Sequence, residues 1–385
     1  MPRVGLSRPL RHLLGAVLLS GLLVSPQPAS AYSVLAHEGL IDALWDDAIV
    51  GLLRQKFPDA TADQIAASRA FAYGGSVIQD LGYYPFGSHF FTNVLHYVRS
   101  GDFVEAMIRE SQTLDEYAFS LGALAHYSSD TSGHPIATNR AVALMYPKLR
   151  AKYGDAVTYA EDPRRHIMVE FSFDVAQLAS GKYPAEAFHR FIGFEVSKEV
   201  LERAFLQIYG LEMKDVFFDE DLAIGTYRFA VSKLIPDLTR AAAKSNKDQL
   251  VYRFTRQDFE KKYGNKYQRP GFFARVIAFL AKIMPKIGPF RALAFDPPTP
   301  QVERLFLESF ARASTRYRGF LDALRNNRLN LENLDFDTGQ PTRLGEYPLA
   351  DETYADLLKK LAERKDVPDA LSQDINRFYG RSAPP

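Results

Sequence analysis

Residues 114–134 have the sequence LDEYAFSLGALAHYSSDTSGH. Their apolar residues recur at steps of three and four, which predicts a helix with one apolar face that runs to about residue 130. His126 and Asp130 are four residues apart, so both project from the same face of this helix. His134 lies directly before Pro135, where we expect the helix to break and the chain to turn His134 back. An imidazole nitrogen and a carboxylate oxygen at this spacing suit a divalent metal ion, although two solvent-facing polar residues would show the same spacing.

Helical spacing of apolar residues extends over most of the remaining chain, and no run of period-two alternation predicts a strand. One helix is expected to begin near residue 102. The other expected helices cover 34–56, 61–80, 89–99, 136–153, 163–181, 184–209, 221–244, 256–263, 301–325, 350–364 and 368–378. We therefore expect an all-α fold, a multi-helix bundle with additional C-terminal helices. Six prolines lie between residues 267 and 300, so this part of the chain is less suited to long helices than the part before it. We place the boundary ahead of them, with a helical domain over 32–250 and a C-terminal helical extension over 251–385.

Residues 1–31 have the organisation of a secretory signal peptide. Three arginines precede an apolar run over 13–24, which is too short to span a bilayer as a permanent helix. Ala29-Ser30-Ala31 then fits the small-x-small rule for cleavage. We expect export and cleavage after Ala31, which makes Tyr32 the new N-terminus and the mature protein secreted or periplasmic. An uncleaved anchor is the alternative.

Charge and cysteine content restrict the classes of partner and site. The chain has 47 basic and 46 acidic residues, and loss of residues 1–31 removes three arginines and no acid, which leaves 44 against 46, or about −2. This balance gives no global positive field for a polyanion, so we expect no specific nucleic-acid partner. Cysteine is absent, which excludes disulfides and thiolate metal sites. Any zinc must then be held by histidine, carboxylate or backbone groups.

Further histidines and acids fall at metal-ligand spacing or beside helix ends, and they are His37, Asp80, His89, His96, His166 and Glu170. His166 and Glu170 are four residues apart, like the pair described above. His89 competes with His96 as the partner of Asp80. Each element alone has an ordinary explanation as a solvated pair, a turn residue or a buried core histidine. Together they would all have to face inward from separate helices, which favours a shared metal site.

The order of these residues resembles that of the bacterial zinc-dependent phospholipases C and, less closely, that of the fungal single-strand-specific nucleases that share their fold. The resemblance covers about residues 32–175 for the motifs and extends to about 245 for the helical domain. It implies three zinc ions, held by Asp80, His96, His126 and Asp130, by the amino nitrogen and carbonyl oxygen of Tyr32 with His37 and a bridging Asp130, and by His134, His166 and Glu170. The family normally begins its mature chain with tryptophan, but backbone groups bind there, so Tyr32 can serve when cleavage follows Ala31.

By this resemblance we expect a zinc-dependent phospholipase C, in which zinc-activated water hydrolyses a phospholipid or another phosphodiester and Asp80 orients or deprotonates that water. Aromatic residues after Asp80 line a mouth for acyl chains, stack nucleobases or pack in the core, and they are Tyr83, Tyr84, Phe86, Phe90 and Phe91. The sparsely basic segment 271–295 either contacts an anionic membrane surface or forms packed helices. The two alternative functions are a single-strand nuclease of the same fold and a zinc-binding surface protein without turnover.

The N-terminal analysis yields a first prediction. Exported protein should begin at Tyr32, because Ala29-Ser30-Ala31 is the cleavage signal. A variant that retains one extra residue before Tyr32 should lose one zinc ion and most activity, because its free amino group is displaced from the ligand position. N-terminal sequencing and zinc analysis of both proteins provide the measurement. Exported protein that begins at any other residue would remove Tyr32 from the ligand set.

Overall fold

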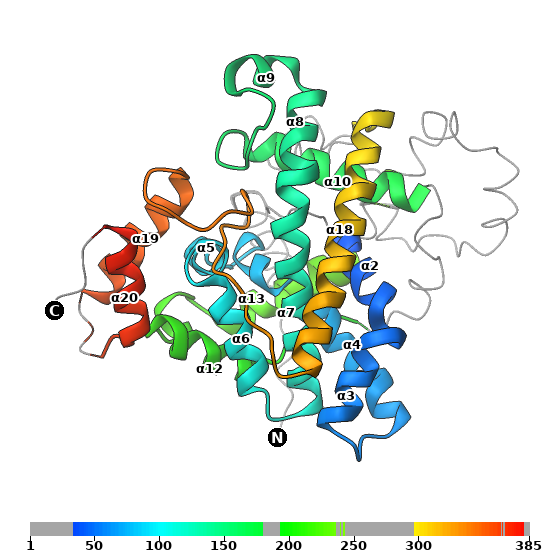
Figure 1. Ribbon diagram of the computed structural model, residues 1–385, viewed down its shortest axis with the longest axis vertical. Coiled ribbons are helices and arrows are strands. Elements are labelled where there is room, and N and C mark those ends of the chain that lie inside the picture. Colours follow the sequence, from blue (N-terminus) through cyan, green and yellow to red (C-terminus); the bar gives the residue numbers. More distant parts are fainter. Residues whose placement is uncertain are drawn as a thin grey trace, which may run out of the picture.

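The computed structural model describes residues 34–179, 193–235, 239, 242, 296–362, 364 and 366–380. These residues are mostly helical and contain no strand, only one antiparallel bridge between Leu334 and Pro341, so the all-α prediction is confirmed (Figure 1). The elements are α2 (Val34–Leu44), η1 (Trp45–Ile49), α3 (Val50–Lys56), α4 (Ala62–Gly75), η2 (Ile78–Tyr83), α5 (His89–Tyr97), α6 (Ser100–Glu110), α7 (Leu114–Gly133), η3 (His134–Thr138), α8 (Asn139–Met145), α9 (Pro147–Tyr153), α10 (Pro163–Ala179), α12 (Lys198–Tyr209), η4 (Met213–Asp215), α13 (Glu220–Phe229), η5 (Ala230–Leu234), α18 (Pro300–Arg325), α19 (Pro348–Leu361) and α20 (Asp369–Phe378). Among the helices of the described chain, none has the length and apolar character needed to cross a membrane.

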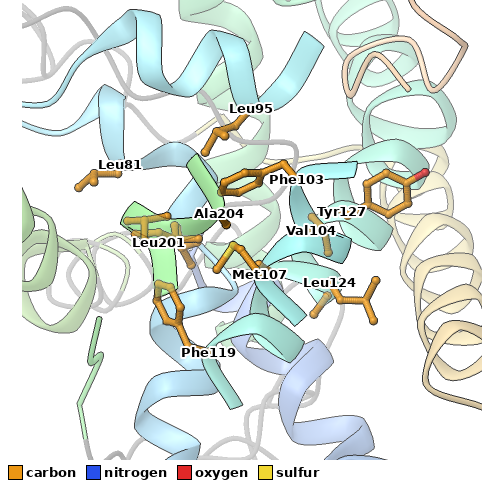
Figure 2. Close-up of a cluster of buried hydrophobic side chains, with 14 of the residues drawn as sticks. Leu81, Leu95, Phe103, Val104, Met107, Phe119, Leu124, Tyr127, Leu201 and Ala204 are labelled. Carbon is orange, nitrogen blue, oxygen red and sulfur yellow. The ribbon is translucent and has the colours of Figure 1, made fainter. Parts of the chain in front are cut away.

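Helix α7 lies at the centre of the molecule, with α4 along one side and α18 along another (Figure 1). It begins at a capping box in which Thr113 and Glu116 satisfy each other's backbone N–H groups. From Glu116 to Gly133 every residue is buried, so this helix is covered on all sides. Figure 2 shows part of the surrounding core, in which Phe103 and Met107 of α6 meet Leu201 of α12.

Two glycine contacts bring the backbones of α4 and α7 together. A Cβ atom built on Gly75 would lie 1.9 Å from the carbonyl oxygen of Phe119, and one on Gly122 would lie 2.1 Å from that of Ala72. Only residues without a side chain allow this approach. Because α4 ends against α7, the 3₁₀ turn η2 that follows α4 also lies beside α7. There the side-chain amide of Gln79 donates to the carbonyl of Ala123 at 3.0 Å.

The expected helix break at Pro135 is wrong. Helix α7 runs to Gly133 and continues without reversal through the π-helical turn η3 into α8. A proline in a regular α-helix clashes with the carbonyl four residues earlier, here that of Thr131, and the wider π turn relieves this clash. His134 is therefore placed by continuation of the helix, one turn beyond Asp130 on the same face.

Other helix boundaries differ from expectation for identifiable reasons. The helix expected over 61–80 begins at the predicted capping residue Thr61 but ends at Gly75. Residues 184–192 of the helix expected over 184–209 lie outside the described residues. Within the described part α12 begins at Lys198, because residues 193–197 are not helical and the N–H of Glu195 donates instead to the carbonyl of Ala70 in α4 at 3.0 Å.

Two further expected segments differ because of a proline or because they lie outside the described residues. The helix expected over 136–153 is divided at Tyr146, because Pro147 begins a new helix. The helix expected over 256–263 and the segment 271–295 lie outside the described residues.

The C-terminal part of the chain packs against the same core. Tyr317 of α18 is buried and donates its hydroxyl to the carbonyl of Leu121 in α7 at 2.9 Å. After α18 the chain crosses α5 and α6, where the hydroxyl of Ser100 donates to the carbonyl of Leu334 at 2.6 Å and the N–H of Phe336 donates to the carbonyl of His96 at 3.2 Å. The boundary at residue 250 stays a prediction, but the described residues on both sides of it contribute to one hydrophobic core.

The contact between α4 and α7 predicts a strong response to one added methyl group. Gly122→Ala should lower the free energy of unfolding by about 1–3 kcal/mol or more, because the methyl meets a backbone carbonyl and the helices must separate. Gly319→Ala in α18 is the matched control, since its Cβ would meet nothing within 4 Å. That change should be neutral or stabilise the helix by roughly 0.5–1 kcal/mol. Urea unfolding of both variants decides the matter, and wild-type stability in Gly122→Ala would contradict the described contact.

Candidate metal centre

Four buried side chains from three elements form the first cluster, and they are Asp80 of η2, His96 of α5, and His126 and Asp130 of α7. One ligand atom of each lies within 4.8 Å of the others. The Nε2 of His126 is 3.1 Å from an oxygen of Asp130, and the Nε2 of His96 is 3.4 Å from Asp80 and 3.6 Å from Asp130. Ligands about 2.0–2.1 Å from a tetrahedral zinc ion are about 3.4 Å apart, so this donor set fits the ion.

The outer nitrogens of both histidines are bound to backbone carbonyls. Nδ1 of His96 lies 2.9 Å from the carbonyl oxygen of Thr92, and Nδ1 of His126 lies 2.9 Å from that of Ser76. A carbonyl oxygen only accepts, so each Nδ1 carries the hydrogen and each Nε2 presents a lone pair to the cluster. This arrangement is typical of metal-ligating histidines. Within the described chain, Nε2 of His126 and both oxygens of Asp80 and Asp130 are buried without a hydrogen bond, as ligand atoms awaiting an ion would be.

The second cluster contains three buried side chains, His134 of η3 and His166 and Glu170 of α10. An oxygen of Glu170 lies 3.7 Å from Nε2 of His134 and 2.8 Å from Nδ1 of His166. The two imidazole rings meet edge to face at 4.9 Å. With three protein ligands, this donor set fits a zinc ion that keeps an open coordination position, which is the arrangement of catalytic sites.

Asp130 also faces a third histidine. Its other carboxylate oxygen lies 3.6 Å from Nε2 of His37, whose ring stacks on that of His126 at 4.6 Å. The two oxygens of Asp130 therefore face different histidines, which is the geometry that a bridging carboxylate requires. Tyr32, the other predicted ligand beside His37, lies outside the described residues.

The two candidate histidines, His89 and His96, lie at different distances from Asp80. The structure brings His96 to Asp80, whereas His89 begins α5 and places its ring 5.6 Å from that of Tyr83, outside both clusters. Burial lowers the pKa of His89, and no carboxylate opposes that effect. The metal-binding roles of all the predicted ligands stay predictions.

Buried carboxylates dominate the electrostatics of the first cluster. Burial alone would lower the pKa of His96, but interaction with Asp130 and Asp80 outweighs it and raises the pKa to about 10. The pKa of His126 is raised for the same reason, again against the effect of burial. Burial would raise the pKa of Asp130, yet the neighbouring histidines hold it well below its usual range. Without a metal ion, protons therefore supply the positive charge that these carboxylates require.

The aromatic residues after Asp80 divide between the site and the core. Tyr83 places its ring 6.3 Å from that of His96 and 6.0 Å from that of Tyr159, whose ring lies 5.8 Å from that of His166. These two tyrosines therefore lie between the clusters. The others pack elsewhere or face solvent: Tyr84 against Tyr227, Phe91 against Phe205 and Phe217, Phe90 beneath Lys360, and Phe86 at 41% exposure.

Sequence reasoning missed three residues around the clusters. Phe336 packs its ring 4.8 Å from that of His96, Asp337 lies 2.8 Å from Nδ1 of His134, and Asn139 lies 2.9 Å from Nε2 of His166. The only available signal was the pair of acids flanking Phe336 ahead of a Thr-Gly turn, an unusual place for charge beside an apolar ring. No spacing rule connects this segment to histidines some 200 residues earlier.

Comparison with known families gives a match over the central part of the chain. Residues 41–219 match the family model described as zinc dependent phospholipase C, which confirms the resemblance inferred from the order of ligands. The matched region contains all seven residues of the two clusters but neither His37 nor Asp337. Comparison with curated proteins and with solved structures found no match.

The raised pKa of His96 predicts a pH-dependent affinity for zinc. At pH 6–8 the metal-free cluster holds a proton that is released only as pH rises towards about 10, and zinc must displace it. The apparent zinc affinity should therefore rise about tenfold per pH unit for each displaced proton. Chelator competition at pH 6, 7 and 8 gives the slope, and His89→Ala should leave it unchanged. A constant affinity over this range, after correction for the chelator, would rule out proton displacement.

Proposed function

We propose that this chain is an exported zinc-dependent phosphodiester hydrolase and that its substrate class is phospholipid, as in a phospholipase C. The match of residues 41–219 to that family supports the reaction class. The observation that best supports the proposal is the hydrogen bonding of four buried histidines. One ring nitrogen of each contacts Thr92, Ser76, Asp337 or Asn139, so the other ring nitrogen presents its lone pair to a carboxylate of the cluster. Neither a solvent-exposed helix face nor an apolar core would require four histidines to be oriented in this way.

Up to three zinc ions are proposed, held by Asp80, His96, His126 and Asp130, by Tyr32, His37 and Asp130, and by His134, His166 and Glu170. Bound zinc supplies a low-pKa water and neutralises the non-bridging oxygens of a phosphodiester. Asp80 is the proposed catalytic residue, because its carboxylate is buried beside both histidines of the first cluster and makes no hydrogen bond in the described chain. One oxygen can bind metal while the other accepts the proton of the attacking water.

Phospholipid is favoured over a nucleic-acid strand by charge. The mature chain carries 44 basic against 46 acidic residues after loss of three arginines, so no excess of cationic side chains is available for phosphate contacts along a strand. Tyr83 and Tyr159 lie between the clusters, where they can contact a headgroup. Contact of segment 271–295 with an anionic membrane surface remains part of this proposal.

The proposal is tested by zinc analysis joined to a substrate panel and one variant. Wild-type protein should contain zinc and cleave phosphatidylcholine in vesicles, with little action on single-stranded DNA or RNA. Asp80→Asn keeps the size and one oxygen ligand, so it should retain part of its zinc while kcat falls by roughly 10²–10⁴, the usual contribution of a positioned base. His89→Ala should be mild, and His96→Ala should lose zinc and activity.

Three outcomes would contradict parts of this proposal. Preferential cleavage of single strands would assign the chain to the nuclease alternative, and zinc without hydrolysis of any diester would assign it to the binding-protein alternative. Near-normal turnover in Asp80→Asn would remove Asp80 from the mechanism.

A further inference from the structure

The turn between Leu334 and Pro341 is held in one conformation. One oxygen of Asp335 accepts the N–H groups of Asp337 at 2.8 Å and Thr338 at 3.0 Å. Gly339 has φ +67°, and a Cβ there would lie 2.8 Å from a backbone carbonyl of α7, so a glycine is required at this close approach. The turn that carries Asp337 is therefore held beside α7 by the side chain of Asp335 and by the close backbone approach at Gly339.

The carboxylate of Asp337 is buried and directed at the second cluster. Its Oδ1 lies 2.8 Å from Nδ1 of His134. Its Oδ2 accepts the hydroxyls of Tyr97 at 2.7 Å and Tyr347 at 2.5 Å. Because Nδ1 of His134 donates to the carboxylate and lies 3.1 Å from the carbonyl of Phe336, the bare nitrogen of His134 is Nε2, which faces Glu170.

The backbone of Asp337 acts on the other histidine through Asn139. The side-chain amide of Asn139 donates to the carbonyl of Asp337 at 2.8 Å, and its oxygen lies 2.9 Å from Nε2 of His166. This fixes the hydrogen of His166 on Nε2 and leaves Nδ1 bare, 2.8 Å from Glu170. The two histidines therefore have opposite tautomers, and both bare nitrogens converge on one carboxylate.

We infer that Asp337 is a positioning residue for zinc at the second cluster, orienting His134 directly and His166 through Asn139. The inference rests on the proposed function, in which His134, His166 and Glu170 hold an ion. Outer partners of this kind fix the ring orientation and raise the basicity of the ligand, and their loss typically costs 10–100-fold in metal affinity.

A purely structural role for Asp337 predicts a different result. The same carboxylate joins Tyr97 and Tyr347, so its removal should reduce stability whether or not it positions a ligand. Tyr347→Phe is the matched control, because it removes one of these structural bonds and leaves the contact with His134. Asp337→Asn is the conservative variant, because it keeps an acceptor oxygen for Nδ1 of His134 but removes the charge.

The experiment measures zinc retained by the full-length mature protein against increasing chelator, with the thermal midpoint recorded for each variant. His134→Ala defines the step that belongs to the second cluster. Asp337→Ala should lower the affinity of that step by about 10–100-fold and leave the step of the first cluster unchanged. Asp337→Asn should show a smaller but measurable loss, and Tyr347→Phe should retain wild-type affinity despite a lower thermal midpoint.

The outcomes separate this inference from the proposed function. Wild-type affinity of the second step in Asp337→Ala, or an equal loss in Tyr347→Phe, would overturn the positioning role. If Asp337→Ala does not fold, wild-type affinity in Asp337→Asn would overturn it instead. Absence of a second step in the wild-type protein would contradict the proposed function itself, whereas a wild-type step that Asp337→Ala retains would contradict only the role of Asp337.

Discussion

The close approach of α4 and α7 is the contact on which the first cluster depends. Gly75 and Gly122 let the two backbones meet, and the end of α4 then lies beside the middle of α7. This position gives the carbonyl of Ser76 to His126 and sets Asp80 opposite the same face. A wider separation would remove both an outer partner and a cluster carboxylate at once. The geometry of the first cluster therefore depends on how the backbones of α4 and α7 pack.

Seven polar side chains in the two clusters are buried, which is costly unless their charges are balanced. Each cluster places carboxylates beside histidines in a buried environment from which water is largely excluded. In the metal-free state the histidines take up protons to balance the charge. The buried carboxylates therefore require positive charge beside them whether or not metal is bound, and one divalent ion supplies the charge of two protons.

The fold class and one pair of residues in each cluster could be predicted because helical spacing is a local property, whereas the grouping of Asp80, His96 and His134 with these pairs was implied only by the family resemblance. His126 with Asp130 and His166 with Glu170 share helix faces, so sequence separation already indicated proximity. The break at Pro135 was predicted wrongly because proline was judged by its effect on a regular α-helix, and a π turn accommodated it. Asp337 could not be predicted, because its contact with His134 depends on where a distant segment crosses α7.

That crossing also has a consequence in time. His134 and Asp337 are 203 residues apart (337 − 134), so a ribosome adding about 5–20 residues per second completes Asp337 roughly 10–40 seconds after His134. During this interval His134 has neither acceptor for its Nδ1 hydrogen, since the carbonyl of Phe336 belongs to the same late segment. Contacts of such long sequence separation form late in folding as well, because the chain entropy of closing the loop opposes them. The outer partner of His134 should accordingly be added last to the second cluster, whose own three side chains lie within 36 residues of one another (170 − 134).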